Sequence, residues 1–237
     1  MEIAILTQNN KFLINKYVKI LAEGLASYGA DIVIFRCSAT AKGKKMSKAT
    51  AMRDIITMFG PLFAIRAIGE AIVSSFRDRP SSFPSRCRII DVPDSQKINA
   101  ELLQAHCKEF RVLLILSGTR IIRRDVLELW EHGVLNVHSS ILPFARGVMP
   151  ALWTFVSKKA MGVSLFRLDE GVDTGEIILQ IPIIKEPKSY FSYLHETKIL
   201  GVNMLLSWVQ TNIFAIKGNS NMEDTYYSYP VRGFKLR

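Results

Sequence analysis

The chain has 237 residues, which is enough for one large α/β domain or for one domain with a short appendage; two full domains are not expected. Hydrophobic residues make up 49% of it and no segment is of low complexity or internally repeated, so a disordered, fibrous or repeat protein is excluded. The net charge of +10 favours acidic partners without choosing among nucleic acids, nucleotides and other acidic ligands.

The amino terminus predicts a cytoplasmic protein. MEIAILTQNN has an acidic residue at position 2 and soon becomes polar, so it lacks the basic start and long apolar stretch of a secretory signal. The most apolar segment, residues 55–76, is interrupted by Gly60, Pro61, Arg66 and Glu70, so no stable membrane insertion is expected. It is expected to form a helical pair packed on the body, with a membrane-surface contact as the alternative.

Three cysteines, Cys37, Cys87 and Cys107, are widely spaced and odd in number. No Cys or His pair has the spacing that zinc sites use, so neither a disulfide framework nor a metal site is expected.

Short apolar runs alternate with helical patterns in the first part of the chain, as in a buried parallel sheet with helical crossovers. The expected strands are residues 2–8, 31–37, 88–92, 112–116 and 134–140, and the expected helices are residues 11–28, 95–109 and 124–132. Residues 39–84 interrupt the alternation and form an insertion, with a helix expected near residues 47–59. The predicted fold class is therefore α/β with a Rossmann-like, mostly parallel sheet.

After Pro150 the pattern changes, because residues 162–168 and 176–183 are strands joined by a short loop. This arrangement predicts an antiparallel extension of the sheet, followed by a long helix over residues 189–210 and a polar tail. We expect a catalytic domain over residues 1–185 and a C-terminal helix and tail over residues 186–237, with a homodimer formed through the latter.

Polar side chains gather where ligands collect in such a sheet, at the carboxyl ends of the strands. Asn136 and His138 are two residues apart at one strand end, so both point to the same face. The later loop DEGVDTG carries Asp169, Glu170 and Asp173. Taken alone, each element is ordinarily a hydrogen-bonded turn, but the two in this order indicate a site.

The stretch LNVHSSILPFARGVMPALW, followed by GVSLFRLDEGVDTGEIILQ, closely resembles the formyltransferase family that uses 10-formyltetrahydrofolate. That family's pattern has an Asn-x-His strand end, a Ser-x-Leu-Pro and Arg-Gly loop, and a later Asp-Thr-Gly loop. The resemblance extends upstream through LLILSGTRIIRRDVL and covers residues 112–183.

The resemblance implies roles for Asn136, His138 and Asp173 in formyl transfer to an amine. Asn136 and a donating His138 would stabilise the oxyanion, and Asp173 would orient His138 and receive the proton that leaves the nitrogen. The folate would contact two loops, with core packing as the alternative for the two isoleucines. The implied folate-binding residues are Gly118, Arg120, Ile121, Ile122, Leu142, Pro143, Glu170 and Val172.

Departures from better-known members favour the short sugar N-formyltransferases, which act on nucleotide-linked amino sugars for surface polysaccharide. The loop TQNNKF lacks the glycines of the glycinamide ribonucleotide enzymes, and only a helix and tail follow Ile183, where methionyl-tRNA enzymes carry a β-barrel. A 4-amino-4,6-dideoxyhexose on GDP or dTDP, such as GDP-perosamine, is the acceptor this comparison implies. The candidate residues that bind this acceptor are Asn9, Asn10, Lys11, Arg146 and Trp153, with a structural role for Arg146 as the alternative.

Other readings stay open at this point. The acceptor could be glycinamide ribonucleotide or methionyl-tRNA, the chain could hydrolyse formyltetrahydrofolate, or it could be an RNA-binding relative without activity. Nucleic acid is not the expected partner. His195, in YLHETK, is expected to be a surface or packing residue of the long helix.

Overall fold

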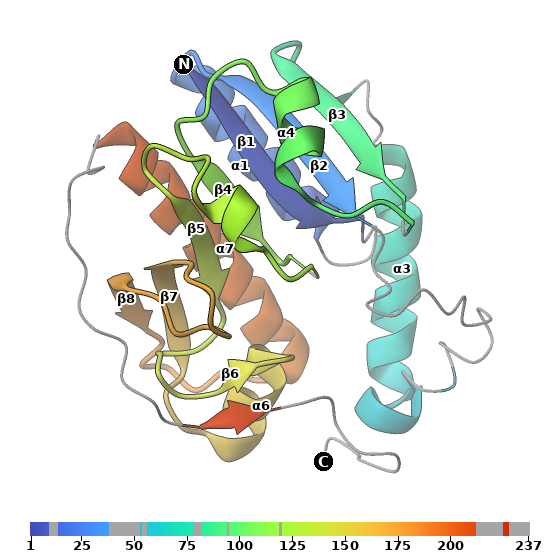
Figure 1. Ribbon diagram of the computed structural model, residues 1–237. Helices are drawn as coiled ribbons and strands as arrows, with labels where there is room; N and C mark the ends of the chain where they lie inside the picture. The colour runs from blue at the N-terminus through green and yellow to red at the C-terminus, as the bar shows by residue number, and fades with distance from the viewer. Residues whose placement is uncertain are drawn as a thin grey trace.

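A computed structural model of the chain describes residues 1–9, 14–37, 53, 56–77, 82–93, 95–118, 120–211 and 225–227. A seven-stranded sheet in the order β3-β2-β1-β4-β5-β7-β8 forms its centre (Figure 1). The strands are β1 (Glu2–Gln8), β2 (Asp31–Cys37), β3 (Cys87–Val92), β4 (Leu113–Leu116), β5 (Val134–His138), β7 (Gly162–Arg167) and β8 (Ile177–Pro182).

Strand directions match the sequence prediction. The strands β3, β2, β1, β4 and β5 are parallel to one another, whereas β7 runs antiparallel to β5 and β8 antiparallel to β7. The strands β1, β2, β4 and β5 are Val-, Ile- and Leu-rich and are buried along most of their length, as a sheet covered on both faces requires, whereas the edge strand β3 is more exposed. The predicted α/β class with an antiparallel extension is confirmed.

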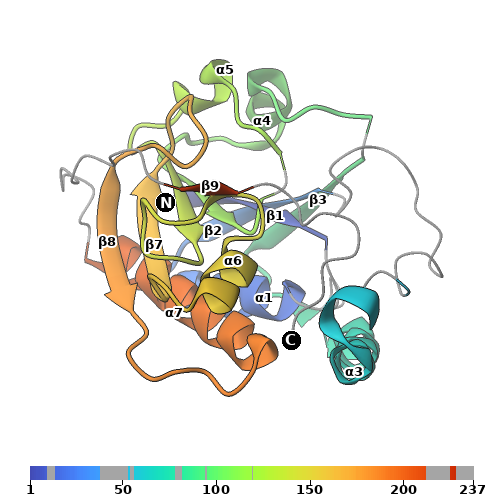
Figure 2. The same ribbon diagram turned by 90° about the horizontal axis from the view of Figure 1, so that it is seen from below.

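Helices cover both faces of this sheet (Figure 2). On one side lie α1 (Asn15–Ser27) and α7 (Tyr190–Gln210), and α3 (Pro61–Arg77) stands at the margin beside α1. On the other side lie α4 (Ala100–His106) and α5 (Arg124–Leu127). Each side has its own core, the larger one between the sheet and the α1–α7 pair.

Both α4 and α5 are shorter than the sequence pattern predicts. The side chain of Asn99 caps α4 by accepting a hydrogen bond from the backbone N–H of Leu102, which fixes the helix start well after residue 95. After α5, the backbone N–H groups of Glu131 and His132 donate to the carbonyls of Phe110 and Arg111. These bonds replace the helical ones, so the expected helix over residues 124–132 ends at Leu127.

The long helix α7 confirms the prediction over residues 189–210 and packs into the larger core through Val202, Leu205 and Trp208. A Cβ on Gly201 would lie 2.4 Å from Cγ1 of Val137 in β5. Glycine therefore lets the helix backbone approach the sheet directly beneath the end of β5. His195 lies at the surface of the helix, one of the two roles expected for it, and its Nδ1 lies 2.6 Å from the hydroxyl of Tyr17 in α1.

The insertion and the tail are described only in part. Residues 53 and 56–59 are helical, and Gly60, with a φ of 83°, separates them from α3. Of the tail, the structure describes residues 225–227, which include β9 (Tyr226–Tyr227). This strand pairs in parallel with β6 (Arg146–Gly147), just ahead of α6 (Pro150–Ser157).

None of the helices within the described ranges is both long and apolar enough to cross a membrane.

Candidate active site

Alternation along β5 sets the positions of Asn136 and His138. Leu135 and Val137 belong to the core on the α1–α7 side, so Asn136 and His138 turn to the opposite face, as predicted. Asn136 is partly exposed, whereas His138 is buried at 3% exposure and its ring lies edge-on to Phe166, with the centroids 6.3 Å apart. An amide and an imidazole thus occupy one carboxyl strand end.

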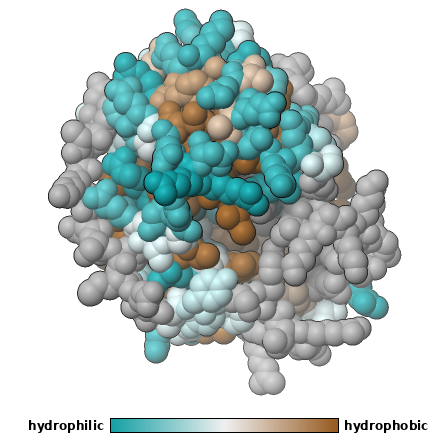
Figure 3. Space-filling model, viewed as in Figure 1, coloured by the Kyte–Doolittle hydropathy of each residue, from teal (hydrophilic) through white to brown (hydrophobic). Residues whose placement is uncertain are grey.

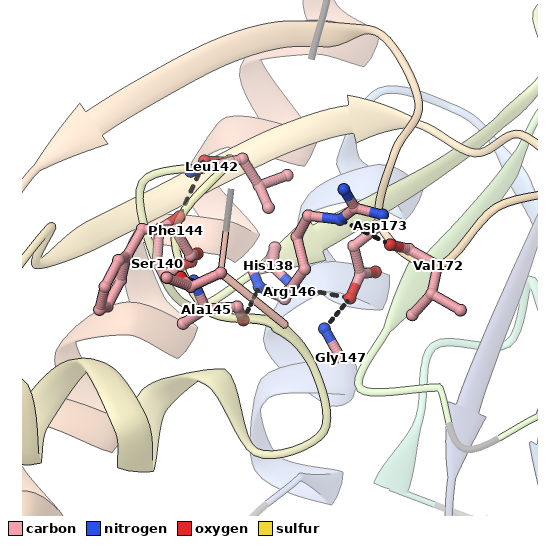
Figure 4. Close-up of polar contacts among 11 residues, drawn as sticks. His138, Ser140, Leu142, Phe144, Ala145, Arg146, Gly147, Val172 and Asp173 are labelled. Atoms are coloured by element: carbon pink, nitrogen blue, oxygen red, sulfur yellow. Dashed lines mark hydrogen bonds and ion pairs between the residues drawn. The ribbon is translucent and has the colours of Figure 1, made fainter. Parts of the chain in front are cut away.

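His138 is held between a carbonyl and a carboxylate (Figure 4). Its Nε2 lies 2.9 Å from the carbonyl oxygen of Ala145, and its Nδ1 lies 3.6 Å from Oδ2 of Asp173. A carbonyl oxygen only accepts hydrogen bonds, so Nε2 carries the proton of the neutral ring. Nδ1 then has a lone pair directed toward a carboxylate, ready to take up a proton.

Burial lowers the pKa of His138 below 6.5, because the charged ring would lose its hydration. The carboxylate of Asp173 and the carbonyl of Ala145 oppose this shift, and the positive charges of Lys198 and Arg146 add to it. His138 is therefore neutral at pH 7, and a proton that reaches Nδ1 is stabilised by Asp173.

Asp173 is placed by a tight loop between β7 and β8. Asp169 shapes this loop, because its Oδ1 accepts hydrogen bonds from the backbone of Gly171 at 3.0 Å and the hydroxyl of Thr174 at 2.6 Å. Asp173 itself has a φ of 52°, a left-handed conformation that aspartate tolerates better than most residues. Its Oδ2 also accepts the backbone N–H of Gly147 at 2.8 Å. The carboxylate therefore ties the loop to β6.

The tail forms hydrogen bonds with residues 145–148, the segment that contacts His138 and Asp173 through its backbone. Thr225 and Tyr227 bond residues 145–148 through three hydrogen bonds of 2.9 to 3.0 Å. The ring of Tyr227 also stacks on Trp153 of α6, with the centroids 4.9 Å apart. Since residues 145–148 include the carbonyl of Ala145 and the N–H of Gly147, β9 braces the surroundings of His138.

Gly147→Ala is expected to loosen this brace and lower activity. Gly147 has a φ of 97°, and an added Cβ would lie 2.4 Å from the carbonyl oxygen of Tyr227, so the strands must separate. Strained backbone of this kind costs about 1–3 kcal/mol. Proteolysis should release the tail sooner than in the parent protein, and kcat/KM should fall. Equal protection of the tail in Gly147→Ala and in the matched variant Gly29→Ala, whose added Cβ meets nothing, would contradict the brace.

The loop after β4 lies at the same edge of the sheet and carries Gly118 and Arg120. Ser117 has a φ of 59°, and its buried hydroxyl has no hydrogen-bond partner among the described residues. The two isoleucines that follow behave differently: Ile122 is 7% exposed and belongs to the core, whereas Ile121 is 88% exposed. Of these two residues, only Ile122 therefore packs in the core, which was the alternative to contact with the folate.

The remaining predicted residues are spread around this centre. Nε of Arg146 donates a hydrogen bond to the carbonyl of Val172 at 2.9 Å. This contact matches the structural role that was the alternative to acceptor binding for this arginine. Glu170 lies 3.6 Å from Nε of Arg124 at the surface. Leu142 is buried in the turn after β5 and joined to Pro143 by a cis peptide bond. Asn9 is exposed at the end of β1, and Asn10 and Lys11 fall outside the described residues.

Lys198 is a residue that the sequence analysis missed. It lies on α7 one turn before Gly201 and is 9% exposed, and its ammonium makes no hydrogen bond or ion pair with the described residues. Burial lowers the pKa of its ammonium from 10.5 to about 8. The sequence carries a signal that Lys198 is buried, because Leu194, Lys198 and Val202 share one face of α7.

Among the described residues, no group of three or more His, Cys, Asp or Glu side chains is arranged to hold a metal ion.

Comparison with known proteins relates this geometry to a family. Residues 82–197, which contain Asn136, His138 and Asp173, match the sequence profile of the family described as formyl transferase. A methionyl-tRNA formyltransferase of Anaeromyxobacter dehalogenans is 35% identical over 142 residues, covering 51% of this chain and 46% of that relative. The match thus spans about half the length of each protein.

Solved structures share the fold over most of the chain. Glycinamide ribonucleotide transformylase 1 from Symbiobacterium toebii has a TM-score of 0.59 at 14% identity over 94% of both chains. The formyltransferase PseJ from Anoxybacillus kamchatkensis, solved with UDP-4,6-dideoxy-4-formamido-L-AltNAc and tetrahydrofolate, has a TM-score of 0.55 at 17% identity over 100% of this chain and 86% of that one. In sequence over residues 82–197, and in fold over nearly its whole length, the chain is similar to the formyl transferases.

Proposed function

We propose that the chain transfers a formyl group from 10-formyltetrahydrofolate to an amine, with Asn136, His138 and Asp173 at the reacting centre. The observation that carries this proposal is the geometry of His138. Its Nδ1 lies 3.6 Å from the Asp173 carboxylate, while its Nε2–H is held by the Ala145 carbonyl. A proton acceptor of this kind is what amine acylation needs, because the attacking nitrogen becomes positively charged.

Each residue has a defined task in this mechanism. When the amine attacks the formyl carbon, Asn136 donates its amide N–H to the oxygen that becomes negative. His138 accepts at Nδ1 the proton released by the attacking nitrogen, and Asp173 stabilises the resulting imidazolium. As the bond between the formyl carbon and the folate nitrogen breaks, His138 returns this proton to the leaving nitrogen, so the ring ends neutral.

The loop after β4 has the features of a folate-binding surface. Ile121 exposes an apolar side chain that a flat ring can cover, and the hydroxyl of Ser117 in the same loop has no hydrogen-bond partner among the described residues. The space-filling view shows hydrophobic side chains in a recess at the centre of the face drawn in Figure 1, below a hydrophilic rim (Figure 3). The exposed side chain of Ile121 supports a pterin ring lying against the loop after β4.

The proposed acceptor is a nucleotide-linked amino sugar, a 4-amino-4,6-dideoxyhexose on GDP or dTDP used in surface polysaccharide. The similarity to PseJ in fold, over the full chain, supports this class. The buried ammonium of Lys198, without an acidic partner among the described residues, favours an anionic acceptor such as a diphosphate.

Methionyl-tRNA is the second candidate acceptor, because the curated relative described above is a methionyl-tRNA formyltransferase. The positive net charge of +10 is compatible with both acceptors.

Release of tetrahydrofolate from 10-formyltetrahydrofolate, followed spectroscopically, tests the proposal. The acceptors are amino sugars linked to GDP, dTDP or UDP, glycinamide ribonucleotide and methionyl-tRNA, with a control that contains none. Release with one amino sugar supports the proposed function, and release with methionyl-tRNA supports the second candidate. Release in the absence of any acceptor would identify a hydrolase, and no release in any reaction would overturn formyl transfer.

A further inference from the structure

A buried hydroxyl in β7 anchors the turn that follows β5 and leads away from His138. Ser164 is 0% exposed and lies opposite His138 in the antiparallel pairing of β5 with β7. Its hydroxyl donates a hydrogen bond to the carbonyl of Ser140 at 2.8 Å and accepts one from the backbone N–H of Leu142 at 2.9 Å. A single side chain of β7 therefore pairs two backbone groups of the turn.

Gln180 completes this anchor from the neighbouring strand β8. Its amide nitrogen donates to the carbonyl of Leu142 at 2.8 Å and to the hydroxyl of Ser164 at 2.9 Å. A serine hydroxyl has one proton to donate and two lone pairs with which to accept, so these contacts use the whole hydrogen-bonding capacity of Ser164. The hydroxyl is therefore fixed in one orientation.

From this anchor the turn continues to the carbonyl that contacts His138 (Figure 4). The hydroxyl of Ser140 donates to the carbonyl of Phe144 at 2.5 Å, one residue before Ala145. The carbonyl oxygen of Ala145 then lies 2.9 Å from Nε2 of His138. The hydroxyl of Ser164 thus sets the position of this carbonyl through Ser140.

Two acceptors compete for the single proton of the neutral His138 ring. The carbonyl oxygen of Ala145 lies 2.9 Å from Nε2, whereas Oδ2 of Asp173 lies 3.6 Å from Nδ1. The shorter contact holds the proton on Nε2, because N–H···O hydrogen bonds weaken beyond about 3.2 Å. If the turn moved away, the proton would shift to Nδ1, where the carboxylate of Asp173 accepts it, and the lone pair at Nδ1 would be lost.

We infer that Ser164 is a positioning residue that holds the Ala145 carbonyl on Nε2 of His138, and so keeps Nδ1 free to accept the proton of the attacking amine. Gln180 supports this role by fixing the hydroxyl of Ser164. The consequence for catalysis rests on the proposed function, whereas the place of the ring proton is a property of the protein without substrates.

Nitrogen NMR of the protein labelled in its histidine rings, without ligands at pH 7, shows where this proton lies. The chain has four histidines, and the signals missing from His138→Ala identify those of His138. We expect the Nε2–H tautomer in the parent protein. In Ser164→Ala the Nδ1–H tautomer should become the major form, and Ser164→Thr, which keeps the hydroxyl, should restore the Nε2–H form.

Steady-state kinetics with the acceptor identified by the tetrahydrofolate assay give a second measurement. Ser164→Ala should lower kcat by tenfold or more with the KM for the acceptor nearly unchanged, and Ser164→Thr should recover most of the loss. Gln180→Met removes only the outer donor, at a partly exposed position, so it should change the tautomer and kcat in the same direction but less. It provides the same test if Ser164→Ala does not fold.

Ser27→Ala is the matched control, because it removes a hydroxyl that also donates to a backbone carbonyl, that of Gly24, at the surface of α1. It should leave kcat and the signals of His138 unchanged. The Nδ1–H tautomer in the parent protein, or the parent's tautomer in folded variants of Ser164 and Gln180, would overturn the role of Ser164. The expected tautomer shift in a chain that transfers no formyl group would contradict the proposed function alone.

Discussion

His138→Ala is expected to lower kcat/KM for formyl transfer by about 10²- to 10⁴-fold, because it removes the group that takes the proton from the attacking nitrogen. Asp173→Asn should have an effect of similar size. The asparagine oxygen can still accept the N–H of Gly147, but the neutral amide no longer stabilises a protonated His138. Steady-state rates with the acceptor identified by the tetrahydrofolate assay measure both effects.

The pH profile separates this role from a structural one. Since burial lowers the pKa of His138, the rate should hold near pH 7 and fall only as the pH drops below 6.5. Asp173→Asn removes a group that raises the pKa of His138, so this acid limb should move to lower pH. A variant that only damaged the fold would lower the rate without moving the limb.

Glu131→Gln is the matched control, because it also turns a carboxylate into an amide, at a surface ion pair with Arg111 outside the site. It should leave the rate unchanged. Near-normal rates in folded His138→Ala, judged by circular dichroism and thermal unfolding, would show that the centre lies elsewhere.

Most of this centre follows from local patterns in the sequence. Side chains along β5 alternate between the two faces of the sheet, so strand geometry alone turns Asn136 and His138 to the same face. The loop of Asp173 was recognised through the family resemblance, and its conformation depends on bonds made by Asp169 within seven residues. Contacts of this kind join residues that are close together in the sequence, so they produce patterns that sequence analysis can recognise.

The remaining features depend on contacts between distant segments. The strand β9 has two residues and pairs with β6 about 80 residues earlier, so neither length nor periodicity marks it. The early end of α5 results from bonds to residues 110–111, which compete with the helical ones. The sequence pattern predicts that α3 packs on the body, but it does not show that the contacts are made with Tyr190 and Phe191 of the distant helix α7.

Lys198→Met is expected to stabilise the fold by about 3 kcal/mol at pH 7, the equivalent of lowering the lysine pKa from 10.5 to about 8. Between pH 8 and pH 10.5, Lys198 is protonated in the unfolded chain but neutral in the folded chain. The stability of the parent should therefore rise as the pH increases from 8 to 10.5, and the cost of the buried ammonium is fully present below pH 8. Methionine fills the same space without a charge, so this pH dependence should disappear.

The same substitution should weaken the enzyme. If the ammonium of Lys198 binds an anionic group of the acceptor, the KM for the acceptor should rise by tenfold or more, while the KM for 10-formyltetrahydrofolate stays near its parent value. Removing this positive charge also raises the pKa of His138, so the acid limb of the pH profile should move to higher pH, opposite to the shift in Asp173→Asn.

Chemical denaturation at pH 7 and 10, combined with steady-state kinetics, tests both effects on one purified variant. Lys198→Arg keeps the charge and serves as the comparison for acceptor binding. A gain in stability with unchanged kinetics would show that Lys198 is buried without a role in the reaction. No gain in stability at pH 7 would mean that the ammonium has a partner or access to water in solution, and that burial alone does not set its pKa.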